Sequence, residues 1–331
     1  MNPPLDRAAS LPTFSIAIEW ENARFAELER TRRMLRALRE QLCDLPAQPE
    51  PPQIIFIYDR EVIDGEMVQN VVAEEFKPEL VPARTRIIAT QGLRYYEQKN
   101  FGALQTDTEV KIFLDCDVVP EPGWLAALLD SFQNPEVGTV AGQTYIEYDN
   151  TLYSKAFALF WFFPLRDPNN ELHRSTHFHA NNVAFRSDIF ARFPFPDIAA
   201  YRGHCGVLAD TLTANGVGIY VQKRARVSHP TPLGLHFFMA RAMNNGRDDV
   251  LVARARVGRN SPLPLRSVYW NFFQSMKNSF RKFRKHAREV GLNPGSAVAA
   301  YVIPLSYFSL KALGELLTFM RPNLVCRLFK V

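Results

Sequence analysis

The sequence is poor in the features that mark secreted, zinc-bound or disulfide-linked proteins. Its cysteines are few and widely scattered, at Cys43, Cys116, Cys205 and Cys326, with no Cys-x-x-Cys pair. This spacing argues against structural disulfides and against a zinc site, and it predicts free thiols in a reducing cytoplasm. Residues 1–13 lack the basic stretch and apolar core of a secretory signal, so no such signal is expected.

Internal repeats and low-complexity tracts are also missing, apart from a proline-rich link at residues 45–53. The chain has 331 residues, of which 47% are hydrophobic and 22% charged, a balance typical of a folded protein. This length allows one large domain with appendages or two modest domains. The formal net charge of +5 is a small excess, so the placement of the basic residues matters more than their number.

The first part of the chain alternates short apolar runs with amphipathic stretches, which predict strands and helices respectively. Strands are expected at residues 14–20, 54–59, 84–90 and 111–117, and helices at residues 23–42, near 64–75 and at 123–132. This order is typical of a parallel sheet covered by helices, whose ligands bind beyond the carboxyl ends of the strands. Glu19, Asp59, Asp115 and Asp117 are expected at those ends.

The pattern becomes mixed after residue 140. Segments that resemble returning strands occur at residues 140–148, 179–190 and 218–230, around an aromatic run that is too short to span a bilayer. From about residue 236 the composition shifts towards helices and basic charge. We therefore predict a catalytic domain over residues 1–235 and a helical extension over residues 236–331.

Asp115 and Asp117 stand one residue apart directly after an apolar run, in the stretch IFLDCDVV. If the strand ends between them, the turn can bring both carboxylates to one ligand. Such a pair can hold Mg²⁺ or Mn²⁺, hard cations that prefer oxygen ligands and bridge to phosphates. Aspartates also end strands by accepting hydrogen bonds from turn amides, so the pair alone leaves both interpretations open.

Further short motifs accompany this pair along the chain. They are SIAIEWEN at 15–22, IIFIYD at 54–59, KNFG at 99–102, ANNVAFR at 180–186 and RARVSHP at 224–230. In this order and at these spacings the motifs resemble the family 2 glycosyltransferases of the GT-A fold, over roughly residues 13–232. The resemblance implies an α/β fold of the GT-A (Rossmann-like) type, with a mainly parallel sheet flanked by helices. It also implies transfer of a sugar from a nucleotide-diphosphate donor to an acceptor hydroxyl, with inversion of the anomeric centre.

The resemblance implies a nucleotide-binding role for residues at the first two strand ends. Glu19, Trp20, Glu21 and Asn22 match the segment that contacts the nucleotide, although only Asn22 remains of the usual Pro-Thr-Tyr-Asn. Asp59 matches the aspartate that contacts the nucleotide base.

The later motifs imply the rest of the donor site. Lys99 and Asn100 match a basic [RK]-N-x-G element of the family. Asp115 is then expected to help hold the ribose and Asp117 to bind the metal, and His229 is expected to complete the metal or diphosphate site.

The chain departs from the family where a general base is expected. The family's Glu-Asp pair falls here on His204 and Cys205, in the stretch YRGHCGVLADTL. Histidine qualifies as a base by its ordinary pKa, whereas cysteine is a poor base for a hydroxyl. Asp210, farther along the same expected helix, and Glu147 are alternatives. A protein that binds its donor without turnover is a third interpretation.

Residues 268–288 combine aromatic and basic side chains at helical spacing. Trp270, Phe280 and Phe283 fall on one stripe and basic residues populate the other side. This pattern is typical of a helix lying on an anionic membrane, and also of an amphipathic helix docked on the catalytic domain. The apolar run at residues 297–310 is shorter than the ~20 residues that a span needs, which favours monotopic or re-entrant attachment.

We therefore expect a metal-assisted glycosyltransferase of hexosyltransferase type that uses Mg²⁺ or Mn²⁺ and a UDP- or GDP-linked donor. Its acceptor is expected to be a carbohydrate or a lipid-linked precursor of a cell-envelope polysaccharide, at the cytoplasmic, inner face of the cell membrane. No nucleic-acid partner is expected, because no binding motif for one is present, and the oligomeric state is not predicted.

Two other functions remain open. FLDCDVV also resembles the loop of haloacid-dehalogenase-like phosphatases, in which Asp115 would be the nucleophile. A degenerate transferase that binds a nucleotide-sugar without catalysis is the second.

Overall fold

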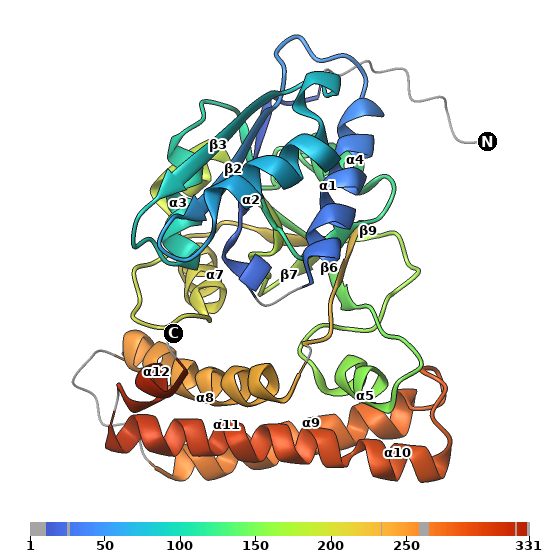
Figure 1. Ribbon diagram of the computed structural model, residues 1–331, viewed down its shortest axis with the longest axis vertical. Helices are drawn as coiled ribbons and strands as arrows, with labels where there is room; N and C mark the ends of the chain where they lie inside the picture. The colour runs from blue at the N-terminus through green and yellow to red at the C-terminus, as the bar shows by residue number, and fades with distance from the viewer. Residues whose placement is uncertain (1–10, 25–26, 233, 258–264, 322, 330–331) are drawn as a thin grey trace.

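The computed structural model describes residues 11–24, 27–232, 234–257, 265–321 and 323–329. A sheet flanked by helices forms one part of the molecule, called here the α/β part. A layer of helices, built from α5 and α8 to α11 and called here the helical layer, lies beside one end of it (Figure 1).

The strands are β1 Phe14–Glu19, β2 Gln53–Asp59, β3 Arg84–Thr90, β4 Val110–Asp115, β5 Val119–Pro120, β6 Thr139–Ile146, β7 Leu172–Ser175, β8 Asn182–Arg186 and β9 Ile219–His229. The α-helices are α1 Leu28–Cys43, α2 Gly65–Val71, α3 Tyr95–Leu104, α4 Trp124–Ser131, α5 Leu152–Phe160, α6 Ser187–Arg192, α7 His204–Ala214, α8 Leu235–Val257, α9 Arg266–His286, α10 Pro294–Ala300, α11 Val302–Met320 and α12 Leu324–Phe329. Short 3-10 turns occur at η1 Glu21–Arg24 and η3 Pro78–Leu80, and a π-turn at η2 Val72–Phe76.

The elements expected in the first part of the chain are present, with small shifts in their bounds. The helix predicted for residues 23–42 is α1, which begins only at Leu28, and residues 25 and 26 lie outside the described residues. The strand predicted for residues 111–117 is β4, which ends at Asp115. Asp117 therefore lies in the turn that follows. Its side chain need not point to the opposite face from that of Asp115, as it would in a continuing strand.

The sheet is mixed, and only its first half is purely parallel. Strands β3, β2, β1 and β4 pair in parallel in this order, and the register places Glu19 beside Asp115. Strand β8 then pairs antiparallel to both β4 and β6, while β9 runs parallel to β6. Because β8 begins where β4 ends, the Asn181 carbonyl oxygen accepts a hydrogen bond from the Asp115 amide at 3.3 Å. The two halves of the sheet thus meet at the edge that carries the aspartates.

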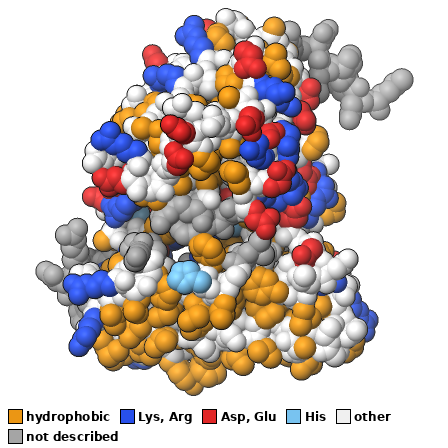
Figure 2. Space-filling view, viewed as in Figure 1, with side chains coloured by type: hydrophobic (Ala, Val, Ile, Leu, Met, Phe, Trp, Pro, Cys, Tyr) orange, Lys and Arg blue, Asp and Glu red, His pale blue; other side chains and the backbone are white. Residues whose placement is uncertain are grey.

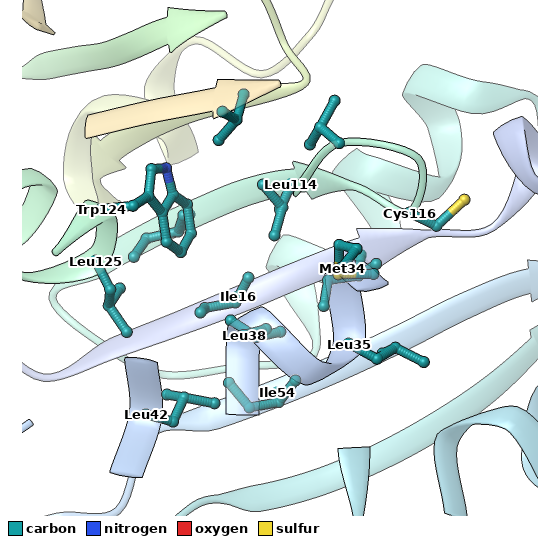
Figure 3. Packing of buried hydrophobic residues seen from close by; sticks show 14 of the residues in the cluster. Ile16, Met34, Leu35, Leu38, Leu42, Ile54, Leu114, Cys116, Trp124 and Leu125 are labelled. Carbon is teal, nitrogen blue, oxygen red and sulfur yellow. The ribbon is translucent and has the colours of Figure 1, made fainter. Parts of the chain in front are cut away.

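One hydrophobic core of the α/β part lies between the sheet and a group of helices that includes α1 (Figure 3), and a second contains residues of α3 and α7. Helix α1 presents Met34, Leu35, Leu38 and Leu42 at the i, i+1, i+4 and i+8 positions of one apolar stripe, and all four are buried. Their partners on the strands include Ile16, Ile54 and Leu114. Burying each such side chain contributes roughly 1.5–3 kcal/mol, which holds β1 and β4 side by side and fixes the edge at which they end.

The helical layer is a packed body and not a loose tail. Aromatic side chains of α5 pack against Phe238 of α8 and Tyr307 of α11 in one buried cluster. Helices α8 and α11 come unusually close, since a Cβ added at Gly246 would lie 2.0 Å from the Lys311 carbonyl oxygen. Gly314 has the same relation to Met243 at 2.2 Å, so the two glycines permit this crossing.

The side of the helical layer that faces away from the sheet is rich in exposed apolar side chains (Figure 2). We call the following residues the apolar face: Tyr269, Trp270, Phe273 and Phe280 of α9, Val298 of α10, and Val302, Leu305, Leu313, Leu316 and Met320 of α11. Phe283, predicted to share the stripe of Trp270, points inward and is buried. Among the described residues, one helical stretch, Pro294–Met320, is long and apolar enough to cross a membrane, and 22% of its most apolar window is buried.

Candidate active site

Acidic side chains meet at the edge where the parallel strands end. Glu19 and Asp115 are both buried there, and Asn22 Nδ2 joins them by donating to Glu19 Oε1 at 3.0 Å and to Asp115 Oδ2 at 2.8 Å. Lys99 Nζ donates to Asp115 Oδ1 at 2.7 Å, and the Tyr95 hydroxyl donates to both carboxylate oxygens. Asp115 is thus a fully hydrogen-bonded carboxylate within an internal network.

The charges of this network shift the pKa values in opposite directions. Burial raises the pKa of Asp115, but Lys99, Arg202 and Tyr95 together outweigh burial and hold this pKa below its usual range. Burial, followed by the Asp115 charge, raises the pKa of Glu19 well above its usual range. Asp115 is therefore the ionised member of the pair at neutral pH.

Asp117 and His229 face each other beside this network. The two are buried, with His229 Nε2 3.8 Å from Asp117 Oδ2, while Asp117 Oδ1 has no hydrogen-bond partner among the described residues. His229 Nδ1 lies 2.7 Å from the Pro230 carbonyl oxygen, which can only accept, so Nδ1 carries the proton and Nε2 presents a lone pair. Burial raises the pKa of Asp117 to about 7, with the Asp115 charge as the second cause.

This pair fits a divalent cation. A buried carboxylate oxygen without a partner and an imidazole lone pair supply two ligands, and a cation would remove the cost of the unpaired charge. Within the described part of the chain, no group of three or more His, Cys, Asp or Glu side chains is arranged to hold a metal. The remaining ligands would therefore have to come from the substrate or from water, as in the usual binding mode of Mg²⁺.

Arg30 fixes the positions of both of these candidate ligands. Its Nε donates to the Asp117 carbonyl oxygen at 3.0 Å, and its Nη2 donates to the Ser228 hydroxyl at 2.7 Å, next to His229. Its third contact is an ion pair with Glu147. Glu147, an alternative base in the sequence, is thus held by Arg30 and, at 3.2 Å, by Arg33.

Two arginines that were not predicted as site residues from the sequence also reach this site. Arg202 precedes α7, donates to Asn22 Oδ1 at 3.0 Å and lies 4.9 Å from the centre of the Tyr95 ring. Arg241 of α8 lies 5.5 Å from the Trp161 ring. The Nε of each is buried without a hydrogen-bond partner among the described residues. Burial lowers the pKa of Arg241 to about 10, which leaves it charged at neutral pH.

These side chains line two adjoining cavities between the sheet edge and the helical layer. The larger, of about 630 Å³, is lined by Asp115, Arg202 and His229 on one side and by residues of α8, α9 and α11 on the other. The smaller, of about 80 Å³, is lined by Asn22, Asp117, Arg202, His229 and Arg241, with Phe329 of α12 at its margin. Residues beyond 235 therefore form one wall of the candidate site.

Three predicted nucleotide contacts, Trp20, Glu21 and Asp59, do not line either of these cavities. Trp20 is wholly buried in the core under the sheet edge. Asp59 ends β2 at the same edge as Asp115, where its carboxylate accepts a hydrogen bond from the Glu61 amide at 2.9 Å. Glu21 lies two residues after Glu19, and its amide donates to Glu19 Oε2 at 2.8 Å. The predicted contacts of these residues with a nucleotide stay predictions.

Of the KNFG element, Lys99 reaches Asp115, whereas Asn100 serves another purpose. The Asn100 side-chain amide exchanges two hydrogen bonds with the Phe195 backbone, at 2.8 and 3.0 Å. It therefore anchors the loop before α7 and does not face the larger cavity.

His204 and Asp210, the predicted bases, both lie on α7 but outside the larger cavity. His204 stacks on Tyr96 with ring centres 4.0 Å apart and lines a separate cavity of about 40 Å³ with Arg94 and Glu97. Burial lowers the pKa of His204 to about 4. Asp210 is exposed and forms an ion pair with Arg256 at 2.9 Å. Cys205, by contrast, lines the larger cavity.

Comparison with known proteins gives matches in one sequence family and among solved structures. The family described as Glycosyl transferase family 2 matches residues 25–193. A search of curated protein sequences finds no significant match.

Among solved structures, the chain is similar to the mannosyltransferase PcManGT from Pyrobaculum calidifontis in complex with GDP-Man and Mn²⁺. The TM-score is 0.59 at 14% identity, over 97% of this chain and 92% of that one. It is also similar to GalNAc-T7 with UDP, GalNAc and Mn²⁺, with a TM-score of 0.51 at 14% identity, over 71% of this chain and 51% of that one. At such identity these likenesses describe the fold.

Proposed function

Because this chain belongs to glycosyl transferase family 2, we propose that it transfers a sugar from a nucleotide-diphosphate donor to an acceptor hydroxyl. The observation that carries this proposal is the convergence of two guanidinium groups, those of Arg202 and Arg241, each with a buried Nε that lacks a hydrogen-bond partner, on a cavity beside Asp117 and His229. Guanidinium N–H groups that are buried without a protein partner fit a ligand that brings its own negative charge, and a diphosphate is such a ligand.

In the proposed donor complex, the nucleoside lies along the sheet edge near Glu19, Glu21, Asn22 and Asp59, with the ribose towards Asp115. Asp117 and His229 would hold Mg²⁺ or Mn²⁺, which neutralises charge on the departing diphosphate. Two structural neighbours were solved with Mn²⁺, one with GDP-Man and one with UDP, which supports a divalent metal and a UDP- or GDP-linked donor.

The protein's own side chains have separate tasks in this proposal. Arg202 and Arg241 hold the diphosphate and stabilise the charge that develops on it. Arg30 keeps the Asp117 turn and the end of β9 at a fixed separation. We propose a single displacement that inverts the anomeric carbon, as the family resemblance implies.

We also propose that the apolar face rests on the inner leaflet of the cell membrane, as a monotopic attachment. Trp270 and Phe280 are 63% and 56% exposed on α9, whose outer side also carries exposed Arg281, Arg284 and Lys285. Exposed aromatic and basic side chains on one helix fit an anionic lipid surface, where each basic residue contributes roughly 1 kcal/mol. A carbohydrate or lipid-linked acceptor, such as a precursor of a cell-envelope polysaccharide, would be met there.

The phosphatase alternative requires Asp115 to act as a free nucleophile. The contacts of Asp115 with Lys99, Tyr95 and Asn22 count against that role. The degenerate transferase is the stronger rival, because His204 and Cys205 stand where the family carries its acidic pair.

The proposal is tested by thermal unfolding of the full chain with UDP, GDP, ADP and CDP, each with and without Mn²⁺. At a ligand concentration of 100 times Kd, binding stabilises the fold by about 2.7 kcal/mol, which raises Tm by several degrees. Asp117→Ala should remove the Mn²⁺-dependent part of this rise. The transferase proposal fails if no nucleotide stabilises the wild type. A Mn²⁺-dependent rise that survives in Asp117→Ala would refute the metal assignment alone.

A further inference from the structure

Sugar transfer to a hydroxyl needs a group that takes the hydroxyl proton, and the usual acidic pair is missing from this chain. The carboxylates that line the larger cavity, among the described residues, are Asp115, Asp248 and Asp249. Asp115 is bound by Lys99, Tyr95 and Asn22, and Asp249 forms an ion pair with Lys311 at 2.5 Å. Asp248 is the one of the three that is not committed to a lysine.

Asp248 belongs to α8 and lies against the turn that leads into α7. Its Oδ1 accepts a hydrogen bond from the Tyr201 amide at 3.1 Å and its Oδ2 accepts one from the Arg202 amide at 2.8 Å. Each oxygen keeps a further lone pair, because a carboxylate offers about four acceptor positions. The contact with α8 is close, since a Cβ added at Gly203 would lie 2.6 Å from Val252 Cγ2.

This placement brings a carboxylate close in the fold to the positions at which the acidic pair of the family is missing. The turn at Tyr201 and Arg202 is followed within three residues by His204 and Cys205, where the acidic pair is expected. Because Asp248 is only 3% exposed and lines the cavity that also holds Asp115, it can meet an acceptor hydroxyl inside a site shielded from bulk water.

We propose that Asp248, supplied by helix α8 of the helical layer, is the general base of the transfer reaction. This inference rests on the proposed function and names the residue that the family motif does not provide.

The proposed step conserves atoms and charge. The acceptor O–H bond breaks as its proton moves to an Asp248 carboxylate oxygen, and the oxygen's electron pair forms the bond to the anomeric carbon. The bond between that carbon and the diphosphate oxygen breaks, and its electron pair leaves on the nucleoside diphosphate. Asp248 then releases its proton to solvent.

The environment of Asp248 suits a base near neutral pH. Burial raises the pKa of Asp248 to about 6, and the charged groups facing it, Arg247 on its own helix and Arg202 across the turn, limit the rise. The carboxylate form therefore predominates above pH 6, and turnover should fall as pH drops through about 6.

The test measures nucleoside-diphosphate release from UDP-Glc, UDP-GlcNAc, UDP-Gal and GDP-Man, with water as acceptor and Mn²⁺ present. Asp248→Asn should lower kcat by about 100-fold or more while the donor KM changes by less than about threefold. The acid limb of the wild-type pH profile should disappear in this variant. Asp188→Asn, at an exposed carboxylate of α6 that lines neither cavity, is the control and should stay within about threefold of the wild-type kcat.

The other possible results would overturn either the assignment of Asp248 or the proposed function. Wild-type kcat in a folded Asp248→Asn overturns the proposal, as does a raised KM with an unchanged pH profile, because that result describes a residue that only positions Arg202. If Asp248→Asn does not fold by circular dichroism, the wild-type profile decides, and absence of an acid limb between about pH 5 and 7 overturns the assignment. A wild type that binds UDP or GDP but leaves every donor intact refutes the base alone, whereas one that binds no nucleotide refutes the proposed function itself.

Discussion

In the α/β part most large apolar side chains are buried between the sheet and its helices. In the helical layer, α9, α10 and α11 expose many of their apolar side chains. Leu38 of α1 is fully buried, while Trp270 of α9 is 63% exposed. Exposed apolar residues also occur in the α/β part, such as Leu80 and Leu104. One part of the chain is thus built as a closed core and the other as a layer with an inner and an outer side.

The inner side of the helical layer differs from its outer side because it lines the candidate active site. Arg241 and Asp248 of α8 face the same cavity as Arg202 and His229 of the α/β part. Gly246 and Gly314 let α8 and α11 pack closely enough to hold this wall in place. The helical layer therefore combines two surfaces, one for the candidate active site and one for a proposed lipid contact.

The largest difference between the two parts should appear in stability. Leu38→Ala leaves a cavity between α1 and the sheet and should lower the free energy of unfolding by about 2–5 kcal/mol. Trp270→Ala should change it by less than about 0.5 kcal/mol, because the side chain is exposed. Urea unfolding followed by circular dichroism measures both. Equal losses in the two variants would contradict the comparison.

A smaller effect is expected from Arg241→Met on donor binding. Loss of one guanidinium from the proposed diphosphate site should weaken nucleoside-diphosphate binding by about 100-fold, or ~2.7 kcal/mol. Arg254→Met, on the same helix and outside the lining of both cavities, is the matched control. Isothermal titration with GDP or UDP and Mn²⁺ gives the Kd values. Unchanged affinity in Arg241→Met would confine the donor site to the α/β part.

The outer side of the layer is tested by lipid binding. The double variant Trp270→Ser, Phe273→Ser should bind vesicles containing anionic phospholipid about 10-fold more weakly, because two side chains can no longer enter the interface. Leu104→Ser removes an exposed apolar side chain of the α/β part and should leave binding unchanged. Vesicle co-sedimentation at low and high salt measures the effect. A wild type that stays in the supernatant would refute the membrane contact.

The smallest effect concerns the pH dependence of stability, to which buried carboxyl groups with raised and with lowered pKa values contribute in opposite directions. Burial raises the pKa of Glu315 in α11 to about 7, whereas Lys99 holds the pKa of Asp115 low. The folded state therefore keeps a proton on Glu315 that the unfolded chain has lost above its ordinary pKa, so stability falls as pH rises from about 4 to 7. Glu315→Gln should remove about 1 kcal/mol of this loss at pH 8. Tm measured from pH 5 to 8 should decline less in Glu315→Gln than in the wild type, and parallel curves would exclude Glu315 as the cause.

Much of the α/β part could be predicted from local pattern. Continuous apolar runs followed by acidic residues predicted β1, β2 and β4, with ends that lie within two residues of the observed ends at Glu19, Asp59 and Asp115. Such strands pair in parallel and share one edge, so the meeting of Glu19 and Asp115 follows from strand geometry. The antiparallel entry of β8 was not predicted, because the pairing of a strand depends on its partners across the sheet.

The helical layer was predicted less well for a related reason. Helical spacing was recognised at residues 268–288, and a helical extension was expected over residues 236–331. Which side of each helix would face inward was not predicted. Phe283 is buried and Trp270 exposed although one stripe was predicted for both, because thirteen residues at 3.6 per turn place them about 140° apart around the helix. Spacing identifies an apolar side of a helix and does not show what covers it.

The sequence by itself determined the family, the parallel half of the sheet and the aspartates at its edge, since each depends on residues close together in the chain. Only the tertiary structure decided that Arg202, Arg241 and Asp248 reach the same cavity, and that Cys205 rather than His204 lines it. The physical reason is that these side chains are brought together by the packing of α8 against α11 and against the turn before α7. Such contacts depend on the sizes of the side chains between the helices, including the absence of a side chain at glycine. The local periodicity of the sequence does not show how these side chains fit together.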